Sequence, residues 1–475
     1  MPDSPPPNPS RPRPQVGLLA LTLEFYETLA PALRAGREAW IRRDLIPALA
    51  PDCEVRFDGA VFRRDDIEAA VARFEAADLD ALLVVLPTYA PSQLALPALQ
   101  RTRLPIVIWN TQELHATDAS FTLDAMIDNH GVHGTQDLAS VLVRSGIRFH
   151  YVTSHVADPT GAAEVRDFIA AAAAVKRLRT ARIGRLGHPF PGMGDFAVDT
   201  THLAATLGCG WVHLGLDDYH RHAADAPPTE VAGLVETYRA RYAVAPDITP
   251  ADLAATARSE LALRRFVADH RLSAITYQFL AFGEDARSET LPFVAASRLM
   301  ADGIGFGGEG DLVGAAGSFL LHALMPPATF SEIFTIDFAG NSVFMSHMGE
   351  ANVAMARPDR PVPLVARPAP IVPTRGRQLV LVTNPTPGPA TFAALVQGPG
   401  GRWRLIAAPV RITDTPPRPG FYVPHFNLQP EGDVREFLTR YAQAGGPHHN
   451  AVCFGDARRR LQFVAQLLDA DYLAL

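Results

Sequence analysis

Short apolar runs alternate with longer amphipathic segments through the first 155 residues, and this alternation constrains the fold most strongly. VGLLALT (16–22), ALLVVLP (81–87) and PIVIWN (105–110) are almost continuous apolar runs, typical of strands buried on both faces of a parallel sheet. The segments between them carry helical spacing, as in 65–78. We therefore expect residues 15–155 to form a doubly wound, Rossmann- or flavodoxin-like α/β domain.

The rest of the chain is expected to form two further domains. Residues 156–327 continue the α/β pattern and predict a second doubly wound α/β domain. From residue 328, short β-rich stretches are separated by Pro and Gly turns, and helical spacing returns only at 433–443. Residues 328–475 therefore predict a C-terminal β-barrel domain with a helical tail. The Pro-rich segment 1–14 predicts a disordered tail.

Bulk composition excludes several classes of partner. The net charge is −7, from 50 acidic against 43 basic residues, and no basic run is long enough to follow a phosphate backbone, so nucleic acid is excluded. The longest low-charge run, Leu312–Met325, is too short to cross a bilayer. The three cysteines are far apart and form no CxxC motif, and residues 1–14 lack the apolar core of a secretory signal. We expect a cytoplasmic protein that does not bind a membrane.

Acidic residues occur in an unusually apolar setting between residues 303 and 350. Glu309, Glu332 and His347 lie among glycines and short apolar runs, where a carboxylate is costly to bury without positive charge. A hairpin would bring Glu332 and His347 onto one face. The paired histidines of GGPHHNAV (445–452) supply a further nitrogen ligand. Two carboxylates and two histidines suit Mn²⁺, Mg²⁺, Co²⁺ or Fe²⁺. The alternative for Glu309 is an ordinary acid at a helix start.

Two loops are candidates for contact with a small molecule. His130 and His133 lie beside glycines in DNHGVHG, where they would be either ligands or plain surface residues. The Gly- and Pro-rich loop GHPFPGMGDF (187–196) would be either a binding loop or a structural turn. No GxGxxG motif follows the first strand, so a dinucleotide site has no support.

Four sequence blocks identify a resemblance to a known family. They are LPFVAASRLMADGIGFGGEGD, FSEIFTIDF, SVFMSHMGE and AGGPHHNAV, in this order along the chain. Their order and spacing resemble the L-arabinose isomerase family within the L-fucose/L-arabinose isomerase superfamily. The resemblance covers nearly the whole chain and implies two α/β domains followed by a β-barrel.

The resemblance implies a metal site and an activity. Its metal ligands fall on Glu309, Glu332, His347 and the second histidine of the pair, His449. The implied reaction is aldose–ketose isomerisation through an enediol, with Glu309 and Glu332 as acid and base and Mn²⁺ or a similar ion as cofactor. A hydride shift is the competing mechanism.

The resemblance also implies substrate contacts, some of which have changed. Tyr89 and His133 match sugar-contacting positions, and Phe282 and Met193 match further pocket positions. Where the family carries two glutamines that touch the sugar, this chain has Leu23 and His130. Since a polar pocket discriminates by leaving groups unpaired, we expect the sugar that is recognised to differ.

Family resemblance further implies a homo-oligomer, such as a hexamer, with active sites at subunit boundaries. Tyr89 and His133 of one subunit would then complete the metal site of another. Alternatives to the isomerase are a metal-dependent epimerase or other sugar enzyme on the same fold, and a catalytically silent sugar-binding protein. The presence of all four ligand residues favours catalysis.

Overall fold

The structure is a computed structural model that describes residues 13–416, 418 and 420–475. Most of the Pro-rich tail predicted at 1–14 lies outside these residues. The chain divides into two compact units, residues 1–176 and residues 177–475, each of which is described by itself. The three-domain division at residues 155 and 327 stays a prediction. In the described part of the chain, no helix is long and apolar enough to cross a membrane.

The first unit is built on a parallel sheet of strand order β2-β1-β4-β5-β6, with β3 also pairing to β1. Every residue of β4 is buried, as its apolar sequence predicts. Helices α4, α5 and α7 cover one face, where Phe74 of α4 packs so closely on β1 that a Cβ at Gly17 would lie 2.6 Å from its ring. The predicted doubly wound α/β fold is confirmed for this unit. Its strands are β1 (Gln15–Leu21), β2 (Glu54–Arg56), β3 (Ala60–Val61), β4 (Ala81–Val85), β5 (Ile106–Asn110) and β6 (His150–Thr153).

The helices of this unit follow its strands along the chain. A π-helical turn at Ile41–Leu45 separates α2 from α3. The helices are α1 (Phe25–Leu29), α2 (Leu33–Trp40), α3 (Ile46–Leu49), α4 (Arg64–Ala76), α5 (Ser92–Arg101), α6 (Leu123–Asp128), α7 (Gly131–Arg144) and α8 (Pro159–Thr180), the last of which leads into the second unit.

The second unit begins with a parallel four-stranded sheet of order β11-β10-β7-β8. Its strands are β7 (Arg182–Leu186), β8 (Gly210–Leu214), β10 (Ala274–Tyr277) and β11 (Gly305–Gly307). A small sheet joins β9 (Tyr242–Val244), β14 (Val362–Ala366) and β15 (Leu379–Leu381). The helices of this part are α9 (Thr200–Leu207), α10 (Leu216–Ala224), α11 (Pro228–Arg241), α12 (Pro250–Asp269), α13 (Phe279–Glu284), α14 (Phe293–Ala301) and α15 (Leu312–Leu324).

The C-terminal part closes into a six-stranded antiparallel barrel. The strands follow the order β16-β19-β12-β13-β18-β17, and β17 pairs back to β16, so the ring has no free edge. The predicted β-barrel is therefore confirmed. Strand β20 (Asp471–Ala474) adds to β17 outside the ring. The bounds are β12 (Ala328–Asp337), β13 (Ser342–Ser346), β16 (Gly388–Gln397), β17 (Trp403–Ile412), β18 (His425–Pro430), β19 (His449–Phe454), α16 (Val434–Gln443) and α17 (Arg458–Leu468).

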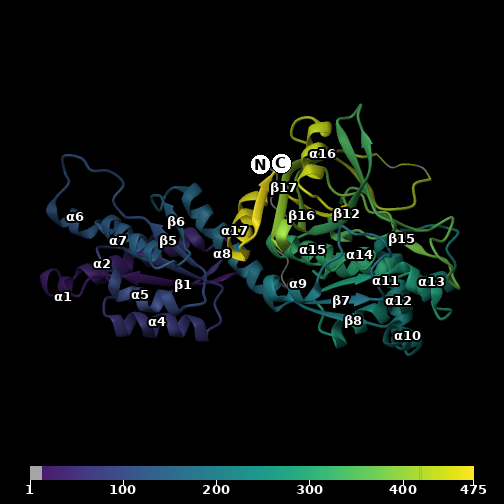
Figure 1. The fold of residues 1–475 in the computed structure, drawn as a ribbon, viewed down its shortest axis with the longest axis horizontal. Helices are drawn as coiled ribbons and strands as arrows, with labels where there is room; N and C mark the ends of the chain where they lie inside the picture. Colours follow the sequence, from purple (N-terminus) through teal and green to yellow (C-terminus); the bar gives the residue numbers. More distant parts are fainter. Residues whose placement is uncertain (1–12, 417, 419) are drawn as a thin grey trace. The chain divides into compact units, whose positions relative to one another are not determined.

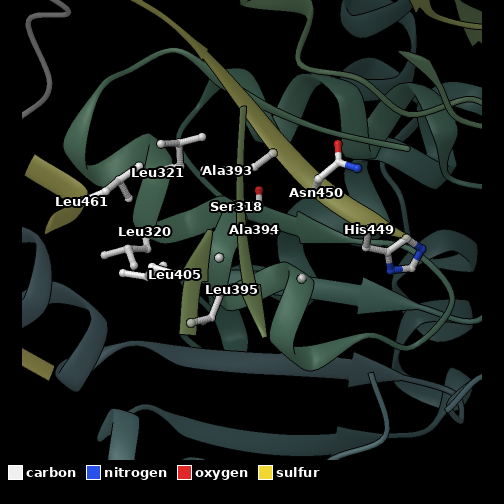
Figure 2. Close-up of a pocket in the computed structure, with 13 residues that line it drawn as sticks. Ser318, Leu320, Leu321, Ala393, Ala394, Leu395, Leu405, His449, Asn450 and Leu461 are labelled. Atoms are coloured by element: carbon white, nitrogen blue, oxygen red, sulfur yellow. The ribbon is translucent and has the colours of Figure 1, made fainter. Parts of the chain in front are cut away.

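Helix α15 joins the parallel sheet to the barrel. It contacts β7, β10 and β11 on one side and β12, β16 and β19 on the other, and Figure 1 shows it between the two sheets. Figure 2 shows Leu320 and Leu321 of this helix facing Ala394 and Leu395 of β16, around a cavity of about 10 Å³. Such a volume holds no more than one water molecule, so this contact is core packing and not a substrate pocket.

The barrel core predicts a large cost for removing one aromatic ring. Phe392 of β16 is fully buried and packs edge-to-face on Phe437 and Tyr441 of α16. We expect Phe392→Ala to lower the free energy of unfolding by about 3–5 kcal/mol, because it leaves a cavity between the barrel and the helix. Chemical denaturation measures the change. Phe338→Ala, at a side chain 65% exposed, is the matched control, and equal losses in both variants would contradict this packing.

Candidate active site

The register of the barrel brings together residues that are far apart in the sequence. Glu332 of β12 pairs with His449 of β19 on one side and with Ser346 of β13, the residue before His347, on the other. Its Oε1 atom lies 2.9 Å from Nε2 of His449 and 3.4 Å from Nε2 of His347. Three of the four predicted metal-ligand residues therefore meet, with Glu332 in the middle of β12, His449 at the start of β19 and His347 just after the end of β13.

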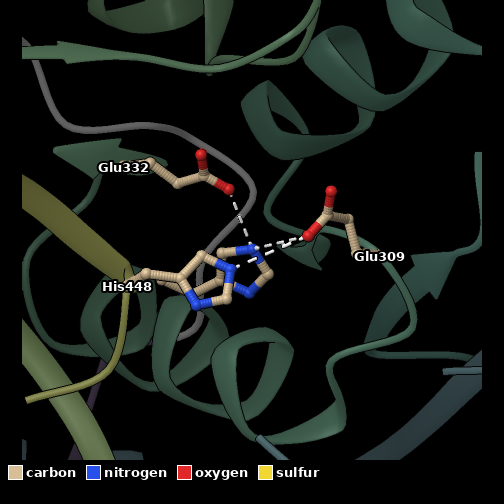
Figure 3. A group of neighbouring side chains, drawn as sticks. Glu309, Glu332 and His448 are labelled. Atoms are coloured by element: carbon tan, nitrogen blue, oxygen red, sulfur yellow. Dashed lines mark ion pairs between the residues drawn. The ribbon is translucent and has the colours of Figure 1, made fainter. Parts of the chain in front are cut away.

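Glu309 reaches the same place from the loop between β11 and α15. Its Oε2 atom lies 3.7 Å from Nε2 of His448 and 3.7 Å from Nε2 of His449. Figure 3 marks the ion pair between Glu309 and His448 with a dashed line. The backbone of Glu309 is left-handed, with φ +58°, and Gly310 follows with φ +86°. A left-handed conformation costs a residue with a Cβ roughly 1–2 kcal/mol, and such strain gathers at functional sites. The loop thus directs the carboxylate into the cluster at an energetic cost.

Each of the three histidines is held by a second carboxylate through Nδ1, which leaves Nε2 directed at Glu309 or Glu332. This arrangement orients imidazoles in metal sites and fixes which nitrogen is free to bind. The Nδ1 pairs are His449 with Asp311 (2.8 Å), His347 with Glu350 (2.5 Å) and His448 with Asp195 (2.5 Å).

The cluster shifts the pKa values of its members. Burial raises the pKa of Glu332, but the His347 and His449 imidazoles outweigh burial and hold this pKa well below its usual range. Burial lowers the pKa of His347, and Glu350 and Glu332 outweigh it, so that the pKa lies well above the ordinary value. Burial lowers the pKa of His448, but the carboxylates of Glu309 and Asp195 outweigh burial and raise this pKa to about 9. Positive charge therefore stabilises these carboxylates, and a bound cation must displace protons from the imidazoles.

The donor atoms fit a divalent metal ion. Ligand atoms of Glu309, Glu332, His448 and His449 all lie within 4.8 Å of one another. Although these atoms are close, Oε2 of Glu309 and Nε2 of both His448 and His449 are buried and make no hydrogen bond to any residue that the structure describes. Buried polar atoms that make no hydrogen bond indicate that a further group binds there. Carboxylate oxygen and imidazole nitrogen suit Mn²⁺, Mg²⁺, Co²⁺ or Fe²⁺.

Aromatic rings and a glycine shape the space around these donors. Phe330 packs edge-on against the rings of His347 and His449, each at 4.9 Å between centroids, and Phe196 stacks on His449 at 5.3 Å. A Cβ at Gly308 would lie 3.1 Å from Nε2 of His347 and 3.2 Å from Nε2 of His449. Because Gly308 has no side chain, the space that Nε2 of His347 and Nε2 of His449 both face stays unfilled by protein atoms.

The loop 187–196 contacts residues of this site, and its binding of a small molecule stays a prediction. The backbone N–H of Phe190 donates to the carbonyl of Glu309 at 2.9 Å, and Asp195 holds His448. Met193, a predicted substrate contact, lies half-buried in the loop. Phe282, another predicted contact, is fully buried in the hydrophobic core, edge-to-face with Tyr219 and Tyr277. Its placement gives it a packing role, and a sugar contact through this ring has no support.

The predicted sugar contacts of the first unit gather where its strands end. Tyr89 stacks on His133 at 4.6 Å between centroids, and the His130 ring lies 4.9 Å from that of His133. Tyr26 joins them through a 2.6 Å hydrogen bond between its hydroxyl and Nε2 of His130. Leu23, half-buried just after β1, accepts a hydrogen bond at its carbonyl from the N–H of Tyr26. The polar groups beyond the carboxyl ends of the strands occupy the usual ligand edge of such a sheet.

The sequence analysis did not predict several residues that form or orient the two side-chain clusters. The sequence does offer a signal for three of them. His448 is the first histidine of the pair in 445–452, and Asp311 and Glu350 lie two and three residues after predicted metal ligands. For Asp195 and Tyr26 no spacing pointed to the contact, because their partners are distant in the chain. The residues missed are Tyr26, Asp195, Asp311, Glu350 and His448.

Parallel α/β sheets, a closed barrel and a half-buried carboxylate–histidine cluster are features of an enzyme that acts on a small molecule. Comparison with known families specifies the class. Residues 189–325 match the L-arabinose isomerase central domain, residues 327–471 match the L-arabinose isomerase C-terminal domain, and residues 25–179 match the fucose/sulfoquinovose isomerase N-terminal domain.

Individual relatives agree with these matches. The L-arabinose isomerase of Acidothermus cellulolyticus is 29% identical over 84% of this chain and 82% of its own length. Those of a Nocardioides species and of Geobacillus kaustophilus are 29% and 27% identical, over 86% and 88% of this chain and 84% and 86% of their own lengths. The chain belongs to the L-arabinose isomerase family, as its sequence blocks indicated.

The loop contacts at the site predict unequal effects at two glycines of positive φ. A Cβ at Gly310 would lie 2.6 Å from the carbonyl oxygen of His188 and 2.6 Å from Cα of Pro189, whereas a Cβ at Gly192 meets nothing within 4 Å. We expect Gly192→Ala to lower the free energy of unfolding by about 1 kcal/mol, the cost of the left-handed backbone alone. Gly310→Ala is expected to cost more, because backbone atoms cannot move aside. Thermal unfolding of both variants measures the difference, and equal stability would contradict the loop packing.

Proposed function

We propose that this protein is a metal-dependent aldose–ketose isomerase that acts through an enediol. The observation that carries the proposal is the convergence of imidazole Nε2 atoms on Glu309 and Glu332, with every Nδ1 held by a further carboxylate. Membership of the L-arabinose isomerase family supports the enzyme class, an intramolecular oxidoreductase that acts on a sugar.

We propose Glu309, Glu332, His347 and His449 as the metal ligands. Nε2 of His347 and of His449 lie close to the same point, the missing Cβ of Gly308, while Glu332 contacts both imidazoles. His448 is the competing fourth ligand, since its Nε2 also faces Glu309. Its side chain is 37% exposed, against 6% for His347 and 0% for His449, which suits contact with a substrate that enters from solvent. The donor set favours Mn²⁺ or a similar hard ion.

The two glutamates supply the acid and base chemistry. One carboxylate removes the proton from C2 of the open-chain aldose, the C2–H electrons form the C1–C2 double bond, and the O1 oxygen takes up a proton. The other carboxylate removes the O2 proton and is the source of the proton that O1 takes up, a C2 carbonyl forms, and the first glutamate, now a carboxyl group, returns its proton to C1. A bound divalent ion would polarise the sugar carbonyl and the adjacent hydroxyl. His347 and His449, held by Glu350 and Asp311, keep the glutamates aligned.

We propose that side chains of the first unit bind the sugar and determine which sugar is recognised. The cluster of Tyr26, Tyr89, His130 and His133 presents hydroxyl and imidazole groups where the family resemblance places sugar contacts. The imidazole of His130, hydrogen-bonded to Tyr26, stands in place of one amide that the resemblance expects, and the side chain of Leu23 offers no polar group in place of the other. A changed sugar preference follows, because unpaired hydroxyls weaken binding. Assembly into a homo-oligomer that shares sites between subunits stays a prediction.

The ligand proposal predicts the metal content of three variants. Gly308→Ala places a methyl group where both imidazoles converge, so we expect metal affinity to fall by roughly two orders of magnitude or more. His347→Ala should lose metal, while His448→Ala should retain it. Metal analysis after dialysis measures the content. Gly233→Ala, on an open helix face, is the control for a glycine substitution. Metal lost from His448→Ala but kept in His347→Ala would contradict the ligand set.

The activity proposal predicts isotope incorporation. Incubation of the metal-loaded protein with a panel of aldoses in D₂O should yield a ketose that carries solvent deuterium at C1, since the enediol route exchanges the transferred proton with a carboxyl group. Mass spectrometry and NMR of the product measure it, with Glu332→Gln as the inactive control. Ketose without deuterium would indicate a hydride shift. Sugar binding without turnover or exchange across the panel would contradict the isomerase proposal.

A further inference from the structure

A second pocket of the 177–475 unit lies among α10, α12 and two loops. Its volume is about 360 Å³, within the range of small-ligand sites. Helix α10 contributes Tyr219 and His220, helix α12 contributes Arg258 and Ser259, and the loops contribute the charged residues Arg287, Glu289 and Arg375. None of these residues takes part in the carboxylate–histidine cluster described above.

The charged side chains of this pocket are mostly positive. Three guanidinium groups line it, from Arg258, Arg287 and Arg375, against the single carboxylate of Glu289. Glu289 lies between two of them: its Oε2 accepts from Nε of Arg258 at 2.8 Å, and its Oε1 lies 3.6 Å from Nη2 of Arg375. Arg287 is paired with Asp285 and Asp217, neither of which lines the pocket. The lining groups themselves therefore carry an excess of positive charge.

The arginines retain donors that no described residue accepts from. Arg258 uses only Nε, toward Glu289. Arg375 donates from Nη2 to the carbonyl of Arg287 at 2.7 Å, which fixes this side chain beside the pocket and leaves Nε and Nη1 without a partner in the described chain. Guanidinium groups present planar forks of donors that match the oxygens of phosphate and carboxylate.

One buried polar atom of this pocket also lacks a hydrogen bond. His220 is 7% exposed, and its Nε2, although 3.3 Å from Oδ2 of Asp285, has no hydrogen-bond partner among the described residues. Buried polar atoms are almost always hydrogen-bonded, so this nitrogen has a bond left to make with a ligand. Burial lowers the pKa of His220, which keeps its ring neutral and able to accept or donate one hydrogen bond.

We propose that this pocket binds a small oxyanion, a phosphate or carboxylate group, through Arg258, Arg375 and His220. The guanidinium groups of Arg258 and Arg375 supply positive charge, and the half-enclosed volume admits a ligand of the size of a phosphorylated or carboxylated metabolite. Glu289 spaces the arginines and opposes the anion. The carboxylate of Glu289 therefore weakens the binding of an anion, whereas the guanidinium groups strengthen it.

Calorimetric titration of the full chain with inorganic phosphate, and separately with citrate, tests the site and distinguishes the two oxyanion classes. We expect binding at millimolar or lower concentration. Arg258→Gln and Arg375→Gln should each weaken it roughly ten- to a hundredfold, since each removes a charge-assisted hydrogen bond. Glu289→Gln should strengthen it, because the opposing charge is lost.

Two controls keep the test decisive. Arg239→Gln removes an arginine of α11 that pairs with Glu236 and does not line the pocket, so it changes net charge alone and should leave binding unaltered. Thermal unfolding of each variant checks that the protein is folded. No binding of either probe, or binding that Arg239→Gln weakens as much as Arg258→Gln does, or weaker binding in a folded Glu289→Gln, would overturn the proposal.

Discussion

The close approach of Glu332 to two imidazoles is the interaction on which the proposed site depends. This carboxylate is only 14% exposed on a barrel strand, where an uncompensated charge would cost several kcal/mol. Compensation comes from the neighbouring strands, which deliver His449 on one side and His347 on the other. A slip of one residue in the register would turn Glu332 to the opposite face. Closure of the barrel, by holding every strand between two partners, fixes that register.

Glu309 reaches the same cluster by a different physical route. It approaches from a loop, and its left-handed backbone stores strain that Gly308 and Gly310 on either side help to accommodate. The packing of α15 between the parallel sheet and the barrel anchors this loop, because Asp311 caps the helix and also holds His449. One aspartate therefore couples the start of a helix to the orientation of an imidazole.

The sequence predicted the fold well because the signals were local. Continuous apolar runs indicated parallel strands, and short strands between Pro and Gly turns indicated the barrel. Within the site, the apolar setting indicated Glu309, Glu332 and His347, and block resemblance added His449. The four side chains do come together. Asp195 was not predictable, since its contact with His448 joins segments whose proximity depends on the packing of a loop against the barrel.

Pocket and core positions were harder to tell apart from sequence. Block resemblance places Phe282 at the sugar, yet it is a core residue between Tyr219 and Tyr277, because a matched sequence position does not reveal which face of a short helix is covered. In the first unit, resemblance identified His130 as a changed position but not its partner Tyr26.

The central claim is that Glu309, Glu332, His347 and His449 together hold a divalent ion. Diffraction from crystals grown with Mn²⁺, collected on both sides of the manganese absorption edge, tests it most directly. We expect one strong anomalous peak at roughly 2.1–2.3 Å from an oxygen of each glutamate and from Nε2 of each histidine. A fully loaded crystal with no peak among these side chains, or with a peak coordinated by His448 in place of His347, would contradict it.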